Sequence, residues 1–215
     1  NILINILYYT QGSNIIFFYP KKLENINNKN YLNNYSRNKH VIEINSERAK
    51  IQFKKEELKN FFYFSKKEEV EYDKKFKYLG KFSLIQSETK KTFTNNKNWN
   101  VHKFQDVINS FPKINWVQIG LEQDCKLVNT IDLRNKTSIR ELAFLIKKSE
   151  YILCLEGFFA HLSSCFNTKA YVIYSGIVPV SNLIYDNIIE VSNTKNLKCF
   201  PCYRMVECNL EKKYC

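Results

Sequence analysis

The chain has 215 residues, of which 44% are hydrophobic and 15% aromatic, a composition that supports a folded core and excludes global disorder. Its formal net charge of +12 first suggests a nucleic-acid partner. Lysine outnumbers arginine 28 to 5, however, and no stripe of arginine with interleaved aromatic residues occurs. We therefore attribute most of the charge to A/T-rich codon usage and predict no nucleic-acid binding.

The first 80 residues carry a weak structural pattern. Residues 2–9 and 15–19 are short apolar runs that suit buried strands, and residues 40–45 alternate as a short strand does. Residues 56–64 suggest a helix followed by an aromatic strand. Residues 68–77 are dense in charge, which predicts a solvated connector at a domain boundary.

From residue 81 onward the pattern is regular, with apolar runs that alternate with stretches of helical spacing. The predicted strands are residues 82–86, 114–119, 131–133, 151–155, 170–174 and 188–191. The predicted helices are residues 101–111, a helix that begins at 138, and residues 157–166. Such alternation is typical of βαβ units. The sequence therefore predicts an α/β fold with a parallel sheet covered by helices on both faces.

Two of the predicted helices have a distinct apolar face. Helix 101–111 is expected to bury Val101, Phe104, Val107, Ile108 and Phe111. Ser138, followed three residues later by Glu141, predicts a capping box at the start of the next helix. That helix is expected to bury Ile139, Leu142, Ala143 and Ile146.

Polar groups gather at the turns where predicted strands lead into helices, which is where parallel sheets bind ligands. Thr137 and Ser138 place two hydroxyl groups and free backbone N–H groups at a helix start, a site that suits an anion. Glu156 and Gly157 stand at the next such start, and His161 follows one turn into the helix. A carboxylate there suits sugar hydroxyls, and a glycine lets a ligand approach the backbone.

Lys97 lies in a long loop, from which it could neutralise a diphosphate. Each of these residues also has a purely structural interpretation: Lys97 as a solvated lysine, Glu156 as a helix cap, His161 as a satisfied helix histidine. Neither a P-loop nor a GxGxxG fingerprint is present.

Five segments, in this order, resemble the C-terminal, donor-binding domain of glycosyltransferase family 9, which includes the ADP-heptose:lipopolysaccharide heptosyltransferases. They are FSLIQSETKKTFTNNKNW, WVQIG, NTIDLRNKTSIRELAFLIKKSEYILCLEGFFAHLSS, AYVIYSG and CFPCY. The resemblance covers residues 79–215. The third segment is the most specific, since a capped helix, a strand and an acidic turn followed by histidine stand in the family's arrangement.

The resemblance implies an inverting GT-B enzyme, in which two Rossmann-like domains face each other across a cleft. It implies a remnant of the N-terminal, acceptor-side domain in residues 1–78, a complete nucleotide-sugar-binding domain in 79–198 and a cysteine-rich tail in 199–215. The general base is expected on a Gly-Asp loop of the N-terminal domain. That loop is not found here, so we expect the chain to begin after it and to be inactive alone.

The resemblance also implies the reaction and its partners. A sugar, a heptose in the relatives named above, would pass from a nucleotide-sugar donor, with an ADP-sugar favoured, to lipopolysaccharide or another surface-glycan or lipid-linked acceptor. No cofactor or bound metal is required. The expected location is the cytoplasm, with peripheral association at the cytoplasmic face of the inner membrane.

The donor-binding residues that the resemblance implies are Lys97 near the phosphates, Glu122 near the ribose, Thr137 and Ser138 at a helix start, and Glu156, Gly157 and His161 along the diphosphate and sugar. Two positions depart from the family pattern. Glu156-Gly157-Phe158 replaces the usual Asp-Ser/Thr-Gly, and Asn100 replaces a frequent proline. This variation leaves open a non-catalytic relative of the donor domain.

Four cysteines, Cys199, Cys202, Cys208 and Cys215, form a C-x2-C-x5-C-x6-C pattern. Four thiolates at such spacing suit a structural zinc ion, and free thiols or disulfides are the alternatives. A zinc knuckle would fit a second function, that of a small basic nucleic-acid-binding protein. Cys154 and Cys165 are isolated, and we expect both to act as small buried hydrophobic residues.

Overall fold

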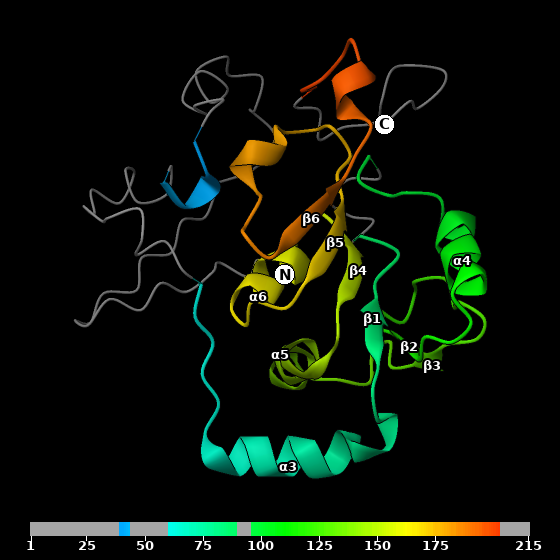
Figure 1. The fold of residues 1–215 in the computed structure, drawn as a ribbon, viewed down its shortest axis with the longest axis vertical. Coiled ribbons are helices and arrows are strands. Elements are labelled where there is room, and N and C mark those ends of the chain that lie inside the picture. The colour runs from blue at the N-terminus through cyan, green and yellow to red at the C-terminus, as the bar shows by residue number, and fades with distance from the viewer. Residues whose placement is uncertain (1–38, 44–59, 90–95, 203–215) are drawn as a thin grey trace.

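The computed structural model describes residues 39–43, 60–89 and 96–202 of the chain. The six predicted runs of residues 82–191 pair into one parallel sheet of order β3-β2-β1-β4-β5-β6 (Figure 1). Its strands are β1 (Ser83–Ile85), β2 (Trp116–Gln118), β3 (Ile131–Asp132), β4 (Ile152–Leu155), β5 (Ala170–Ile173) and β6 (Ile188–Val191). The predicted α/β class and parallel sheet are thus confirmed. The strands predicted at 2–9 and 15–19 lie outside the described residues.

The strand order contains a switch point between β1 and β4. The chain runs from β1 outward to β2 and β3, then crosses back to β4 and continues outward through β5 and β6. Leu84 pairs with Ile152 across this switch, and Leu155 pairs with Ile173 in the next ladder. Because neighbouring connections leave the sheet in opposite directions there, the carboxyl ends of β1 and β4 frame the expected ligand position.

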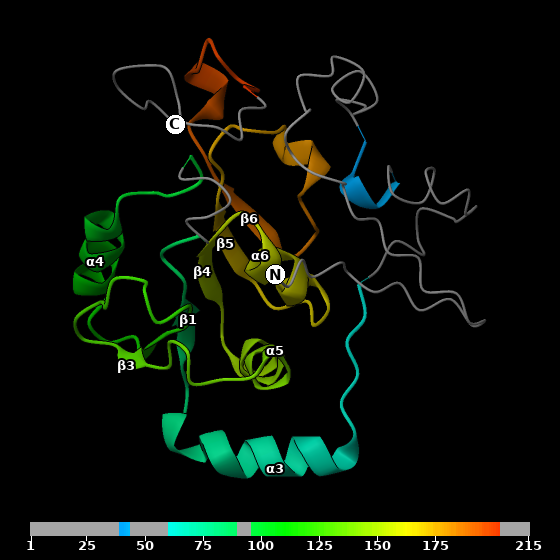
Figure 2. The same cartoon turned by 180° about the vertical axis from the view of Figure 1, so that it is seen from behind.

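Helices cover both faces of the sheet (Figures 1 and 2). Helix α4 (Val101–Ser110) lies on one face, and α5 (Ile139–Lys148) and α6 (Phe158–Ser164) lie on the other. Asn100 caps α4 by accepting a hydrogen bond from the backbone N–H of His102, at 2.9 Å. Ser138 and Glu141 form the predicted capping box of α5. Local side-chain bonds therefore fix where both helices begin.

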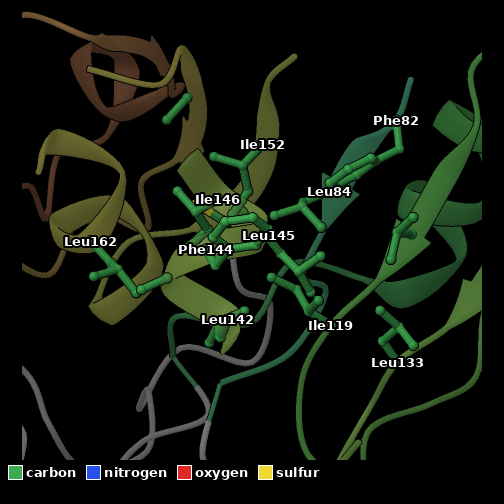
Figure 3. Packing of buried hydrophobic residues seen from close by; sticks show 14 of the residues in the cluster. Phe82, Leu84, Ile119, Leu133, Leu142, Phe144, Leu145, Ile146, Ile152 and Leu162 are labelled. Carbon is green, nitrogen blue, oxygen red and sulfur yellow. The ribbon is translucent and has the colours of Figure 1, made fainter. Parts of the chain in front are cut away.

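Helix α5 contributes the centre of the larger core cluster (Figure 3). Its side chains from Leu142 to Ile146 are buried and pack toward Leu84, Ile119 and Ile152 of the sheet. Burial of Leu142, Ala143 and Ile146 confirms the predicted face. Ile139 was predicted wrongly: it is the first residue of α5 and is 42% exposed.

Helix α4 buries a narrower face than its spacing predicts. Phe104 and Ile108 are buried in the second cluster, with Val101 and Val107 packed against it. Phe111 remains 54% exposed, which contradicts the prediction. It is the C-cap residue, and its extended φ of −125° takes its side chain off the helical face.

The predicted connector at residues 68–77 is wrong, because this segment is helical. Helix α3 (Lys66–Phe76) and the 3-10 turn η3 (Lys77–Leu79) bury Tyr72, Phe76 and Leu79 in the same core as α5. The charges that suggested a solvated connector form ion pairs with α5: Lys75–Glu141, Glu68–Arg140, Glu69–Lys147 and Asp73–Lys148. Figure 1 shows α3 lying across the base of the fold, beneath α5. The domain limits themselves stay predictions.

Two further strand predictions fail near the N-terminal side. Residues 41–43 of the predicted strand 40–45 are helical, and residues 60–64, the described part of the segment predicted as a helix followed by an aromatic strand, form neither helix nor strand. Phe62 and Phe64 still pack on the core. The remaining elements are the 3-10 turns η4 (Val180–Asn182) and η5 (Thr194–Asn196). Among the described residues no helix combines the length and apolar character needed to cross a membrane.

Candidate functional site

The carboxyl ends of β1 and β4 are joined by the side chain of Gln86. Its Oε1 accepts a hydrogen bond from the backbone N–H of Leu155 at 3.0 Å, and its Nε2 donates to the carbonyl of Glu88. Gln86 is 3% exposed. A buried amide with both ends satisfied makes this part of the switch point rigid. It therefore holds the residue after β4, Glu156, in a defined place.

Glu156 is a buried carboxyl with one unused oxygen. Its side chain is 2% exposed, and Oε1 accepts a hydrogen bond of 2.6 Å from the hydroxyl of Ser175. Within the described residues Oε2 has no hydrogen-bond partner. Burial raises the pKa of Glu156, while the charge of Lys97 and the Ser175 bond oppose the rise. Such an oxygen suits a ligand hydroxyl, because it lacks a protein partner.

Gly157 follows Glu156 and has a backbone conformation that favours glycine. Its φ is +144°, and a Cβ built there would meet no described atom within 4 Å. Conformation and not crowding therefore requires glycine at this position. The open space above its backbone lets a ligand approach the start of α6.

His161 lies one turn into α6 and is held by Tyr185. Its Nδ1 lies 2.6 Å from the Tyr185 hydroxyl. Burial lowers the pKa of His161 to about 4, with further contributions from His40 and Lys97. The imidazole is therefore neutral at physiological pH. A neutral imidazole has one N–H donor, which a phosphate or hydroxyl oxygen can accept.

Lys97 lies in the loop before α4, and its neighbours are fixed. Asn98 accepts hydrogen bonds from the backbone N–H and the hydroxyl of Thr89, at 2.8 and 2.7 Å. Trp99 packs edge-on against Phe104 with ring centroids 5.1 Å apart, as a packing anchor does. The charge of Lys97 acts on both Glu156 and His161. The structure thus brings four predicted residues together: Lys97, Glu156, Gly157 and His161, which we call the switch-point cluster.

Two other predicted residues, Ser138 and Glu122, have partners elsewhere. Ser138 accepts from the backbone N–H of Glu141, whose carboxylate in turn accepts from the Ser138 N–H at 2.8 Å. The helix start predicted to bind an anion therefore already holds a carboxylate. Glu122 is exposed and accepts from Asn135 at 3.3 Å. No hydrogen bond or ion pair found in the described ranges links Glu122, Thr137 or Ser138 to the switch-point cluster, so their donor-binding roles stay predictions.

Comparison with known proteins gives matches at the level of structure. Neither a family model nor a curated protein matches the sequence. The glycosyltransferase family 9 structure from Veillonella parvula DSM 2008 is similar over 72% of this chain and 49% of its own, with a TM-score of 0.60 and 10% identity. The chain has the fold of the family 9 glycosyltransferases.

Two Escherichia coli structures support the same conclusion. Heptosyltransferase WaaC with ADP is similar over 73% of this chain and 51% of its own, with a TM-score of 0.52 and 10% identity. ADP-heptose lipopolysaccharide heptosyltransferase II is similar over 66% and 50%, with a TM-score of 0.50 and 11% identity. The resemblance predicted from the sequence is thus confirmed for the fold, which is of GT-B type. The chain spans about half the length of these structures.

The cysteines that the structure describes differ in how deeply they are buried. Cys154 is fully buried, as predicted, and burial raises the pKa of its thiol. Cys165 is half-buried. Cys199 and Cys202 are free thiols, and Cys208 and Cys215 lie outside the described residues. In the part of the chain that the structure describes, no group of three or more His, Cys, Asp or Glu side chains is placed to hold a metal.

Sequence reasoning missed the residues that support the switch-point cluster. Gln86 directly follows β1, and Ser175 lies shortly after the end of β5. Their positions at the ends of buried strands could therefore have indicated a supporting role. Tyr185 and Asn60 gave no such signal. Asn60 donates to the hydroxyl of Ser164, at 2.5 Å, from 104 residues away.

Proposed function

We propose that this chain is the nucleotide-sugar-binding half of an inverting glycosyltransferase of the family 9 type. The observation that carries the proposal is the switch-point cluster, which gathers a cation, a buried carboxyl, an open glycine and a neutral imidazole at the carboxyl ends of β1 and β4. Ligands of such folds bind at this position. A similar E. coli structure is described with ADP.

Each residue of the switch-point cluster has a distinct task in this proposal. Lys97 neutralises the donor diphosphate, and Glu156 accepts hydrogen bonds from the sugar hydroxyls. Gly157 gives the ligand access to the backbone, and His161 donates a hydrogen bond to an oxygen of the ligand. Together they bind and orient the donor so that its anomeric carbon faces the acceptor side.

The acceptor and its general base belong to the other half of the enzyme in this proposal. The base would deprotonate the acceptor hydroxyl, which then displaces the nucleoside diphosphate with inversion and without a bound metal. We propose an ADP-sugar, with a heptose as the first candidate, as donor and a lipopolysaccharide-like or lipid-linked glycan as acceptor. The proposed location is the cytoplasmic face of the inner membrane.

Isothermal calorimetry of the chain with ADP, UDP and their sugars tests the proposal. We expect ADP binding that weakens roughly tenfold or more in Lys97→Met, because a charge-assisted bond to phosphate is lost. Lys103→Met is the matched control: Lys103 lies over the Trp99 ring, 5.3 Å from its centroid, in the next helix. Absence of binding to every nucleotide, or equal weakening in both variants, would refute the proposal.

A further inference from the structure

Tyr185 lies between two histidines at the edge of the switch-point cluster. Its hydroxyl is 2.6 Å from Nδ1 of His161, and the two rings meet edge-on at 85°. On its other side the ring meets His40 edge-on, with centroids 4.7 Å apart. Within the described residues, the hydrogen bond found for the His161 ring is the one at Nδ1. The partner of one imidazole nitrogen fixes which nitrogen carries the hydrogen.

The chemistry of the two partners gives this hydrogen bond a direction. Burial raises the pKa of Tyr185 to about 12, so the phenol keeps its hydrogen at neutral pH. A phenol O–H is a good donor, and the unprotonated nitrogen of a neutral imidazole is a good acceptor. Nδ1, 2.6 Å from the hydroxyl, is therefore assigned as the acceptor, and Nε2 carries the hydrogen of the neutral ring.

We propose that Tyr185 is a positioning residue that holds His161 as the tautomer with hydrogen on Nε2. Only the role of this tautomer rests on the proposed function: the Nε2–H would donate to an oxygen of the donor diphosphate. The ionisable groups whose charges act on the His161 ring are His40 and Lys97. Both lower the pKa of His161 and so disfavour a positive charge on its ring. Lys97 thus supplies the cation and His161 a neutral, oriented donor.

Nitrogen NMR of the uniformly ¹⁵N-labelled chain tests the tautomer without any ligand. The chain has three histidines, so the imidazole signals can be assigned with single His variants. We expect His161 to show a protonated Nε2 and an unprotonated, hydrogen-bonded Nδ1 from pH 6 to 8. In Tyr185→Phe the Nδ1 signal should move and average over both tautomers. Tyr171→Phe, the same change on β5, should leave it in place.

Two results would overturn the inference. One is a protonated Nδ1 in the wild-type chain, and the other is a His161 spectrum that Tyr185→Phe leaves unchanged. The first result needs no variant, so a folding defect of Tyr185→Phe cannot hide it.

Two substitutions of His161 test its role toward the ligand. A glutamine amide reaches roughly the position of Nε2, and an asparagine amide that of Nδ1. We expect His161→Gln to keep ADP affinity within about threefold of wild type and His161→Asn to lose about tenfold or more. Equal affinities, or the reverse order, would contradict an Nε2 donor. Failure of ADP to bind the wild-type chain would instead refute the proposed function, while the NMR result would still decide the role of Tyr185.

Discussion

Replacement of Glu156 by glutamine should stabilise the protein at alkaline pH. The wild-type carboxyl is 2% exposed, and its Oε2 has no hydrogen-bond partner within the described residues. An unpartnered polar group in this state costs about 1–3 kcal/mol when it is neutral and more when it is ionised. Glutamine keeps the length of the side chain and an oxygen for Ser175; its amide nitrogen also lacks a partner, but it carries no charge. We therefore expect Glu156→Gln to raise the free energy of unfolding at pH 8 by about 1 kcal/mol or more, through removal of the buried charge.

The pH dependence of this effect follows from the direction of the pKa shift. Burial raises the pKa of Glu156 in the folded state above its unfolded value. Its favourable contribution is therefore fully present below the unfolded pKa and is lost as the pH rises through the folded pKa. The variant and the wild-type chain should unfold at the same urea concentration near pH 4 and diverge toward pH 8.

Urea unfolding at both pH values, followed by fluorescence, measures the difference. Glu150→Gln is the matched control, because Glu150 is 40% exposed and pairs with Lys81 at 2.7 Å. Its effect should stay within about 0.5 kcal/mol at either pH. A Glu156→Gln protein that is less stable than wild type at pH 8 would show that the attraction between Glu156 and Lys97 outweighs desolvation. A difference that is equal at both pH values would refute the titration argument.

Four further substitutions test the fold and one predicted site residue. Ser138→Ala should lower the free energy of unfolding by about 1 kcal/mol through loss of the capping box, with ADP affinity by calorimetry unchanged; weaker ADP binding would support a donor-site role instead. Gly120→Ala should lower the thermal midpoint, because φ is +146° and the new Cβ would overlap Oδ2 of Asp124; an unchanged midpoint would contradict this. Leu145→Ala, in the core, should cost about 2–5 kcal/mol in urea unfolding, and Ile139→Ala, half-exposed, clearly less; equal losses would contradict the burial pattern.

Local signals were sufficient for the elements from residue 82 to 191. There each apolar run is bounded by caps or turns, and the Ser138 capping box marks a helix start that needs no tertiary information. Helix α3 was missed although Ser65 and Glu68 form the same kind of box, and Tyr72 and Phe76 are spaced four apart. High charge density hid these signals. The charges of α3 form ion pairs with those of α5, and such a tertiary contact cannot be read from the local sequence.

The candidate site was predictable only where it follows the strands. Glu156 and His161 are placed by the end of β4, so the position of one buried strand indicates both. Tyr185 lies between η4 and β6 and contacts His161 of α6 from 24 residues away. No local spacing encodes such a contact. A single sequence therefore indicates the candidate site residues at strand ends better than the residues that hold them in place.

At the departure Glu156-Gly157-Phe158 a hydroxyl group still lies beside the acid, but it comes from another part of the chain. The family pattern places a hydroxyl residue directly after the acid, whereas here Gly157 occupies that place. Glutamate is one methylene longer than aspartate, and its Oε1 accepts from Ser175 at 2.6 Å. Ser175 follows β5, the strand that pairs with β4 through Leu155 and Ile173. The segment after the neighbouring strand thus supplies a hydroxyl beside the acid, so the variation leaves the proposed donor-binding role of Glu156 chemically feasible.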